Sequence, residues 1–290
     1  MVSYTATLDV DQATVWHLSA LLNTERRRRG TRTGTRSLTC YKQAVLILRW
    51  FRDATAIDAL ARDNHISRAT GYRYVDEGVD VLADQAPDLH EVLEHARLSP
   101  EDPLILDGKL FPCDRCSEPG PTGESDLWYS GHKHRHGGNI QFLSDARGEP
   151  LWVSEVEPGS TADITAARLH VFPLVHKATT EGLVVLADSG YEGAGVGVRT
   201  PIKRPPEVDE RRWHADNRAH NRLLRGLRCI GERAMAVLTG RWRALRHTTM
   251  SPSKIGMIVQ AALALTNIEK QTRCRVAGGN FPLRPSQNRA

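Results

Sequence analysis

Residues 183–191 read Leu183-Val-Val-Leu-Ala-Asp188-Ser-Gly-Tyr191, a run of apolar residues followed by an aspartate. A short, continuous apolar run is typical of a strand that is buried on both faces of a sheet. A charge at the end of such a strand is unfavourable unless it is paired or holds a metal ion. The stretch therefore predicts a buried strand over residues 183–187 and a functional carboxylate at Asp188.

A second aspartate stands in the same setting. Asp107 follows the apolar run of residues 104–106, and we expect it to end the first strand of the sheet. Two such strands side by side would place both carboxylates at one edge of the sheet, where their like charges repel. A divalent cation relieves that repulsion, and hard oxygen ligands favour Mg²⁺ or Mn²⁺, which suit phosphoryl transfer. The two aspartates therefore predict a magnesium or manganese site.

A third acid, Glu232, lies in a basic stretch that we expect to form a long helix from about residue 209 to residue 238. Arg225, Arg228 and Glu232 recur at helical spacing and share one helix face. If Glu232 points into the metal site, the two arginines line the approach to it and bind DNA phosphates. The alternative is a salt-bridge ladder on a solvated helix. The strand aspartates favour the metal ligand.

The segments between these acids alternate between strand and helix patterns. Residues 139–143 and 151–156 predict a hairpin with a turn at 145–150. A helix is expected at 160–170, with Ser160 or Thr161 as its N-cap and Asp163, in its first turn, in a structural or supporting role. A loop over 192–206 and a final helix at 254–269 complete the pattern. This order predicts an RNase H-like α/β domain, a mixed sheet flanked by helices.

The preceding part of the chain is helical in pattern, with helices expected at 12–27 and 40–51. Residues 55–74 have the layout of a helix-turn-helix, followed by further short helical pieces up to residue 83. The turn is Asn64-His-Ile66, with Ile66 as its buried plug, and Ser67 caps the second helix. Small Ala61 lets the two helices cross closely. The start of the second helix would offer the following residues to DNA: Ser67, Arg68, Thr70 and Arg73.

Charge is unevenly distributed along the chain. The net charge is +5, and basic blocks at residues 26–36 and 199–246 lie on either side of more acidic stretches. This pattern indicates a polyanion bound at two places, although a solvated helix face is the simpler alternative. The loop at residues 129–136 is also basic, and Lys133 is a candidate DNA contact near Asp107. A metal site of His132, His134 and His136 on alternate strand positions is a weaker alternative.

Composition places the chain among soluble globular proteins. It has 290 residues, of which 40% are hydrophobic and 25% charged, and no apolar run long enough to span a membrane. The five cysteines form no disulfide framework, and Cys113 and Cys116 lack the second pair that a structural zinc site needs. No secretory signal is evident at the N-terminus, so we expect a cytoplasmic, nucleoid-associated protein.

These patterns divide the chain into four parts. An N-terminal helix and basic loop occupy residues 1–36, and the helix-turn-helix domain occupies 37–98. The catalytic domain is expected at 103–272 and a C-terminal tail at 273–290.

Short motifs follow one another in an order that resembles the DDE transposases, in particular the insertion-sequence-five and Harbinger-like group. The resemblance covers nearly the whole chain. The motifs are Leu106-Asp-Gly-Lys-Leu, Tyr129-Ser-Gly-His-Lys, Asn139-Ile-Gln, Pro158-Gly-Ser-Thr-Ala-Asp163, Ala187-Asp-Ser-Gly-Tyr-Glu-Gly, Asn217-Arg-Ala-His and Gly231-Glu-Arg-Ala.

This resemblance implies that Asp107, Asp188 and Glu232 form the acidic triad of an RNase H-like enzyme. The implied activity is cleavage at transposon ends and strand transfer of the freed 3′-OH into target DNA. It also implies a homo-oligomer that brings two ends of double-stranded DNA together in a synaptic complex. The sequence departs from the family pattern at Lys109, where a small residue is usual, and in its histidine-rich loop at 132–136.

Two other functions remain open at this stage. A helix-turn-helix regulator would explain the N-terminal half but gives the two strand aspartates no purpose. A metal-dependent endonuclease or resolvase on the same fold would act by hydrolysis alone, with the same metal ligands.

Overall fold

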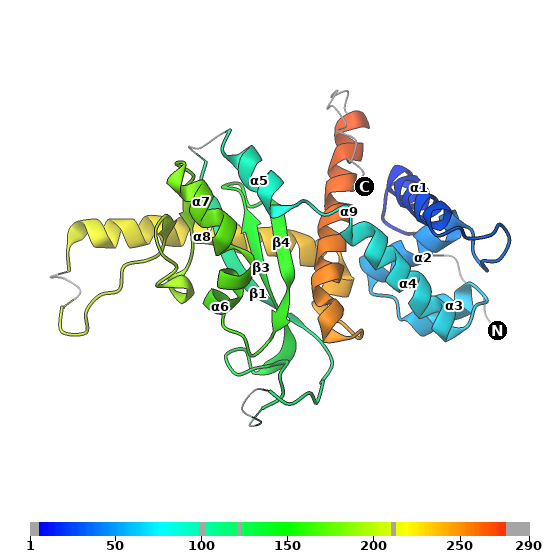
Figure 1. The fold of residues 1–290 in the computed structure, drawn as a ribbon, viewed down its shortest axis with the longest axis horizontal. Coiled ribbons are helices and arrows are strands. Elements are labelled where there is room, and N and C mark those ends of the chain that lie inside the picture. Colours follow the sequence, from blue (N-terminus) through cyan, green and yellow to red (C-terminus); the bar gives the residue numbers. More distant parts are fainter. Residues whose placement is uncertain (1–5, 99–101, 121–122, 124, 210–212, 277–290) are drawn as a thin grey trace. The chain divides into compact units, whose positions relative to one another are not determined.

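The computed structural model describes residues 6–98, 102–120, 123, 125–209 and 213–276 (Figure 1). The chain forms two compact units, one made of residues 1–82 and 264–290 and the other of residues 83–263. In the described residues, no helix is long and apolar enough to cross a membrane.

The first unit is helical. Its helices are α1 (Gln12–Arg28), α2 (Cys40–Asp53), α3 (Ile57–Asp63) and α4 (Arg68–Ala83), together with the C-terminal part of α9 (Ile255–Val276). Helix α2 begins where Thr39 accepts a hydrogen bond from the Lys42 amide. Buried Glu77 accepts hydrogen bonds from Arg36 at 2.7 Å and from Gln43 at 2.9 Å, so its charge is compensated inside the unit. The helices expected at 12–27 and 40–51 are confirmed.

Helices α3 and α4 are joined by a short turn and lie close together. A Cβ atom added at Gly71 would stand 3.0 Å from Ile57 Cγ2 and 3.5 Å from Ala61 Cβ, so small residues set the crossing. Ser67 Oγ accepts a hydrogen bond from the Thr70 amide at 3.2 Å and caps α4 as expected. Two details differ from the sequence prediction. Ile66 is only half-buried, and α4 is one continuous helix of 16 residues rather than several short pieces.

The second unit is built on a mixed sheet. Strands β1 (Leu104–Pro112), β3 (Arg135–Ser144) and β4 (Pro150–Pro158) are antiparallel neighbours, with β3 in the middle. On the other side of β1, β5 (Val185–Leu186) and β6 (Val198–Arg199) join in parallel. The short strand β2 (Tyr129–Ser130) pairs with the start of β3. The expected hairpin and the mixed sheet flanked by helices are confirmed.

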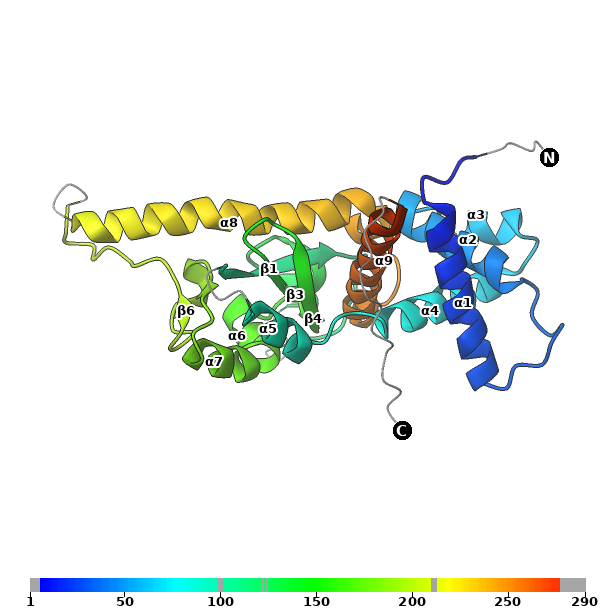
Figure 2. The ribbon, with the colours of Figure 1, turned by 90° about the horizontal axis from the view of Figure 1, so that it is seen from above.

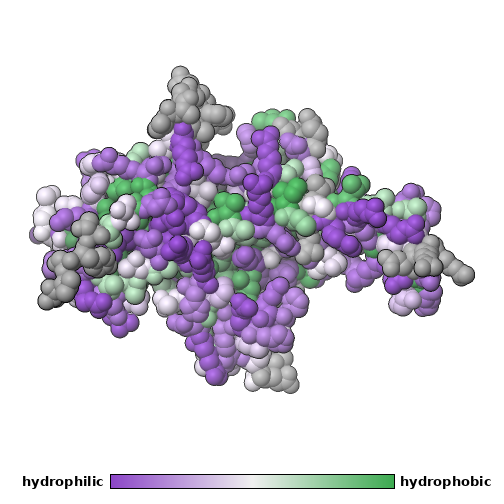
Figure 3. All heavy atoms as spheres, turned by 180° about the vertical axis from the view of Figure 1, so that it is seen from behind, coloured by the Kyte–Doolittle hydropathy of each residue, from purple (hydrophilic) through white to green (hydrophobic). Residues whose placement is uncertain are grey.

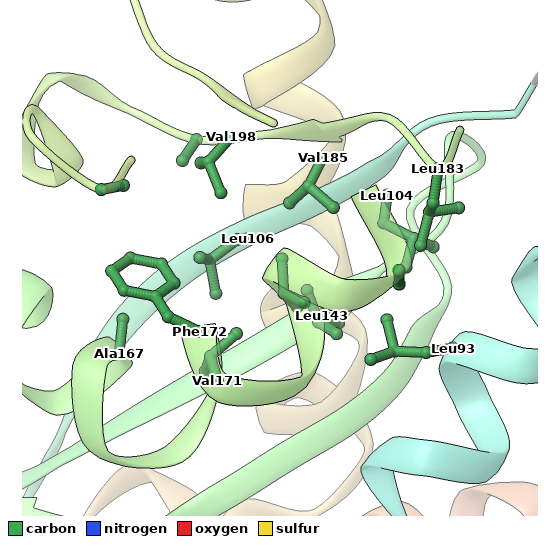
Figure 4. Close-up of a cluster of buried hydrophobic side chains, with 14 of the residues drawn as sticks. Leu93, Leu104, Leu106, Leu143, Ala167, Val171, Phe172, Leu183, Val185 and Val198 are labelled. Carbon is green, nitrogen blue, oxygen red and sulfur yellow. The ribbon is translucent and has the colours of Figure 1, made fainter. Parts of the chain in front are cut away.

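Helices cover both faces of this sheet, as Figure 2 shows. Helices α5 (Leu89–Ala96), α6 (Asp163–His170) and α7 (Phe172–Thr180) pack over one face, and α8 (Ala215–Arg241) crosses the other. Leu104 and Leu106 of β1 join the apolar core beneath α6 and α7 (Figure 4). Between them, Ile105 faces α8, where a Cβ atom added at Gly231 would stand 2.8 Å from Ile105 Cγ2. The α8 backbone therefore lies directly on β1.

Several element boundaries differ from those predicted. Strand β1 does not end at Asp107 but continues to Pro112, because residues 108–112 keep pairing with β3. Helix α6 begins at Asp163 with Ala162 at its N-cap, because the Thr161 amide is bonded to the Pro158 carbonyl in a turn. Neither Ser160 nor Thr161 is therefore the cap.

Two further boundaries are corrected near the C-terminal half of the sheet. Strand β5 is shorter than the apolar run, and the loop predicted at 192–206 contains β6. Helix α8 begins at Ala215, later than expected. Three short 3₁₀ helices complete the unit, namely η1 (Ser189–Tyr191), η2 (Arg243–Arg246) and η3 (Pro252–Lys254).

Candidate active site

Strand register places the two aspartates side by side. In the parallel pair of β1 and β5, Leu104 lies opposite Val185 and Ile105 opposite Leu186. Continuing this register by two residues along both strands brings Asp107 level with Asp188. Asp188 keeps an extended backbone, with φ −81° and ψ 179°. Side chains alternate along a strand, so both carboxylates belong with Ile105 on the face that α8 covers. Both residues are half-buried.

Each aspartate is oriented by a backbone amide close to it in sequence. Asp107 Oδ1 accepts a hydrogen bond from the Gly108 amide at 2.8 Å. Asp188 Oδ1 accepts one from the Gly190 amide at 2.7 Å, at the start of η1. A carboxylate has about four lone-pair sites, so these bonds orient the group and still leave it able to bind a cation.

Lys109 and Glu232 share the environment of Asp107. Lys109 is half-buried and lies on the same face of β1 as Asp107. Its pKa is lowered, chiefly because burial disfavours the ammonium, while the charges of Asp107 and Glu232 act in the opposite direction. Glu232 is exposed on α8, next to the Gly231 contact with β1. The α8 side of the sheet thus gathers acids around a single buried-strand lysine.

The donors on this face fit a hard divalent cation. Carboxylate oxygens are the ligands that Mg²⁺ and Mn²⁺ prefer, and the register brings two of them together on adjacent strands. Within the part of the chain that the structure describes, no three His, Cys, Asp or Glu side chains are gathered as a metal cage. The three predicted ligands are therefore not gathered into one cage in the described residues. The register extends to a level position for Asp107 and Asp188, and Glu232 lies on the helix that covers the same face.

Asp163 lies on the opposite face of the sheet, in a buried hydrogen-bond network. Its Oδ1 accepts from Asn139 Nδ2 at 2.7 Å and from Gln141 Nε2 at 3.5 Å. The Tyr191 hydroxyl donates to Gln141 Oε1 at 2.6 Å. Burial first, and then the neighbouring carboxylates, raise the pKa of Tyr191 well above its ordinary value, so the hydroxyl remains a donor. This setting supports the structural role predicted for Asp163.

Sequence reasoning gave no role to Gln141 or Tyr191. Both stand in the motifs that carry the family resemblance, but their partners are far away in the chain. One local pattern in the sequence could have indicated Gln141. Asn139 and Gln141 are two residues apart, so they are polar side chains on the same face of a buried strand. Buried polar side chains of this kind need partners, and that need could have identified them.

A comparison with known protein families places Asp107, Asp188 and Glu232 in one domain. Residues 106–267, more than half of the chain, match the family described as DDE superfamily endonuclease. The chain belongs to the DDE superfamily endonucleases. The matched range starts just before Asp107 and includes Asp188, Lys109 and Glu232. Comparisons with curated proteins and with solved structures found no match. A DDE endonuclease domain indicates metal-dependent cleavage of DNA, and such domains usually use divalent metal ions.

Two of the residues predicted to bind DNA in the DDE domain, Lys133 and Arg225, are exposed. Lys133 is exposed in the turn that joins β2 to β3, and Arg225 is exposed on α8. The side chain of Arg228 lies outside the described residues. Hydrophilic side chains predominate on the face shown in Figure 3, with smaller hydrophobic patches between them.

The histidine loop differs from its prediction. His132 and His134 lie in a turn, and His134 has a φ of 51°, so they are not at alternate positions of one strand. His136 instead pairs with Asp126 at 3.1 Å. The geometric premise of a three-histidine metal site is therefore wrong.

Cys113 is a buried thiol beside β1, and burial raises its pKa to about 11.

The candidates in the first unit also lie near or at the surface. Arg68 and Arg73 are exposed on the first turns of α4, behind the Ser67 cap. Arg68 pairs with Asp58 at 2.9 Å, and Arg73 donates a hydrogen bond to half-buried Thr70 at 3.0 Å. Their guanidinium groups are held in place by neighbours on α3 and α4 and remain accessible to solvent.

Proposed function

We propose that this DDE endonuclease is a DNA transposase, in which Asp107, Asp188 and Glu232 bind Mg²⁺ or Mn²⁺. It would cut DNA at transposon ends and join the freed 3′-OH to target DNA. The observation that carries the proposal is the register of β1 and β5, which brings Asp107 level with Asp188 on the face covered by the Glu232 helix.

The side chains of this chain have distinct parts in such a reaction. Asp107 and Asp188 hold the metal from adjacent strands, and Glu232 completes the site from α8. Divalent metal ions held by these carboxylates would supply activation of the attacking oxygen and stabilisation of the leaving oxygen. Lys109 lies beside these carboxylates, and Lys133, Arg225 and Arg228 are proposed to bind the DNA backbone.

We further propose that the catalytic domain, residues 103–272, is RNase H-like and belongs with the insertion-sequence-five and Harbinger-like group. Support comes from the antiparallel strands β1, β3 and β4, followed by helices α6 and α7 and then by the parallel strand β5. Asp163 supports the site from the opposite face of the sheet through its bonds to Asn139 and Gln141.

The first unit is proposed to hold double-stranded DNA. Helices α3 and α4 would act as a helix-turn-helix within a domain of residues 37–98, with the following residues at the DNA: Ser67, Arg68, Thr70 and Arg73. Support comes from the close packing of the two helices at Gly71 and from the capped start of α4. Residues 1–36 would add a basic arm and 273–290 a tail. Two copies would form the synaptic complex.

A strand-transfer assay tests this function. The full chain is incubated with Mg²⁺, a labelled duplex that carries the flanking sequence of its gene, and a supercoiled target plasmid. The proposal predicts that label becomes joined to the plasmid. Cleavage of the duplex without joining would instead identify a hydrolytic endonuclease. Binding without cleavage, in Mg²⁺ and in Mn²⁺, would favour a DNA-binding regulator.

A further inference from the structure

Strand pairing alone does not hold Asp188 in its place. The described pairing between β1 and β5 consists of Leu104 with Val185 and Ile105 with Leu186, and it stops before Asp188 is reached. Directly after Asp188 the chain turns into η1. The backbone before Asp188 is held up to Ala187, whose amide donates to the Arg199 carbonyl at 3.0 Å. A contact at the far end of the segment from residue 188 to residue 191 would fix Asp188 from its other side.

The side chain of Tyr191 provides this contact. It is fully buried at the end of η1, and its hydroxyl donates to Gln141 Oε1 at 2.6 Å. Gln141 lies on β3, and β1 runs between β3 and β5. The hydrogen bond thus ties the segment that carries Asp188 to a strand on the far side of β1.

A glycine in β1 makes room for the bond to cross. Gly108 lies opposite Gln141 in the register and directly follows Asp107. A Cβ atom at position 108 would stand 2.9 Å from Gln141 Nε2 and would collide with the carboxylate of Asp163. The network can pass over β1 only because residue 108 has no side chain.

The far end of the bond is itself fixed. Gln141 is fully buried, and its Nε2 donates to Asn139 Oδ1 at 3.2 Å and to Asp163 Oδ1 at 3.5 Å. Its backbone amide donates to Ser154 Oγ on β4 at 2.9 Å. The amide group of Gln141 is therefore locked in one orientation, with its oxygen towards Tyr191.

We propose that Tyr191 and Gln141 form a brace that positions Asp188 for metal binding. The proposal rests on the function proposed above, in which Asp107 and Asp188 hold the metal. Tyr191 is a positioning residue and not a catalytic one, since it acts through the segment it anchors. Without its hydroxyl, the Asp188 carboxylate would spend less time level with Asp107, and metal affinity would fall.

The test measures binding of Mn²⁺ to the full chain by electron paramagnetic resonance of the free ion. Tyr191→Phe and Gln141→Met each remove one partner of the brace, and Asp188→Asn removes the proposed ligand. Tyr74→Phe is the matched control, because Tyr74 is also buried and its hydroxyl accepts a hydrogen bond from the Leu38 amide at 3.2 Å in the other unit. Thermal unfolding verifies that each variant is folded.

The brace predicts that Tyr191→Phe and Gln141→Met each weaken Mn²⁺ binding about tenfold. The double variant should lose little more Mn²⁺ affinity than Gln141→Met alone, because Gln141→Met already removes the bond to Tyr191, together with the bonds from Gln141 Nε2 to Asn139 and Asp163. Tyr74→Phe should lower the unfolding temperature without changing Mn²⁺ affinity.

Other outcomes separate the two proposals. If Asp188→Asn weakens Mn²⁺ binding while folded Tyr191→Phe and Gln141→Met bind it like the wild type, the brace is overturned and the metal site stands. If Asp188→Asn binds Mn²⁺ like the wild type, the proposed metal site is overturned and the brace with it. Should Tyr191→Phe fail to fold, Gln141→Met decides the question.

Discussion

Asp107 and Gly108 are neighbours on β1 but lie on opposite faces of the sheet. The face covered by α6 and the face covered by α8 carry different kinds of polar group. On the α6 side, the Asp163 carboxylate accepts hydrogen bonds from two buried amides, and Tyr191 closes the network. On the α8 side, Lys109 has Asp107, Glu232 and Lys133 as charged neighbours. The α6 face thus carries a buried hydrogen-bond network, whereas the α8 face carries several charged side chains.

This difference teaches how to assign acids that look alike in the sequence. Asp163 and Asp107 both lie close to the sheet and are half-buried. A carboxylate whose oxygen accepts hydrogen bonds from buried side-chain amides is suited to a structural role, since removing it takes away a charged hydrogen-bond acceptor inside the protein. Acids that approach one another across adjacent elements are better suited to a cation, because their like charges repel until a cation compensates them.

The largest expected effect comes from Glu232→Gln on the α8 side. If Glu232 is a metal ligand, Glu232→Gln should lower the rate of Mg²⁺-dependent DNA cleavage at least about a hundredfold, because the charge that binds the metal is removed. Stability should hardly change, because the side chain is exposed. Cleavage rates and thermal unfolding check both statements. Exposed Glu155→Gln is the control and should cleave like the wild type. Full activity in Glu232→Gln would mean that the residue only serves a surface salt bridge.

Substitutions on the α6 side of the sheet should mainly change the free energy of unfolding. Asp163→Ala removes the charged acceptor that Asn139 and Gln141 share, although Asn139 Nδ2 still donates to the Thr161 carbonyl and Gln141 Nε2 to Asn139 Oδ1. We expect a loss of about 1–3 kcal/mol in the free energy of unfolding, because hydrogen bonds to a charged group are lost. Asp163→Asn should lose less, since its amide oxygen still accepts. Urea unfolding measures both. An Asp163→Ala variant as stable as the wild type would show that the network is not closed around this carboxylate.

The smallest expected effect concerns Lys109, whose ammonium competes with the metal for the charge of Asp107 and Glu232. Lys109→Met should lower the Mg²⁺ concentration needed for half-maximal cleavage by about threefold. Lys109→Arg keeps the charge and should leave that concentration unchanged. A metal titration of cleavage distinguishes the two variants. A higher Mg²⁺ requirement in Lys109→Met would indicate that the lysine helps to hold the substrate phosphate.

Much of the fold follows from local patterns in the sequence. Apolar runs and turn residues identify β1, the β3–β4 hairpin and β5, because strand burial and turn chemistry are local properties. The helical spacing of α1 and α2 and the Ser67 cap of α4 are local as well. The acids themselves stood out because a charge beside a buried strand needs an explanation.

What the sequence does not reveal depends on contacts between distant residues. The end of β1 at Pro112 is set by its pairing with β3, not by Asp107. The bond between Tyr191 and Gln141 joins positions 50 residues apart. Whether Asp107 faces α6, which carries Asp163, or α8 depends on the pairing register of β1, in which a shift by one residue exchanges the faces.

The central claim is that Asp107 and Asp188 hold the catalytic metal and that Asp163 does not. The direct measurement is Mg²⁺-dependent nicking of a labelled duplex carrying the flanking sequence of the gene, by the wild type and by Asp107→Ala, Asp188→Asn and Asp163→Asn. The account predicts nicking by the wild type and by Asp163→Asn, and none by the other two variants, which still bind the duplex. Nicking that persists in Asp107→Ala or Asp188→Asn would contradict it.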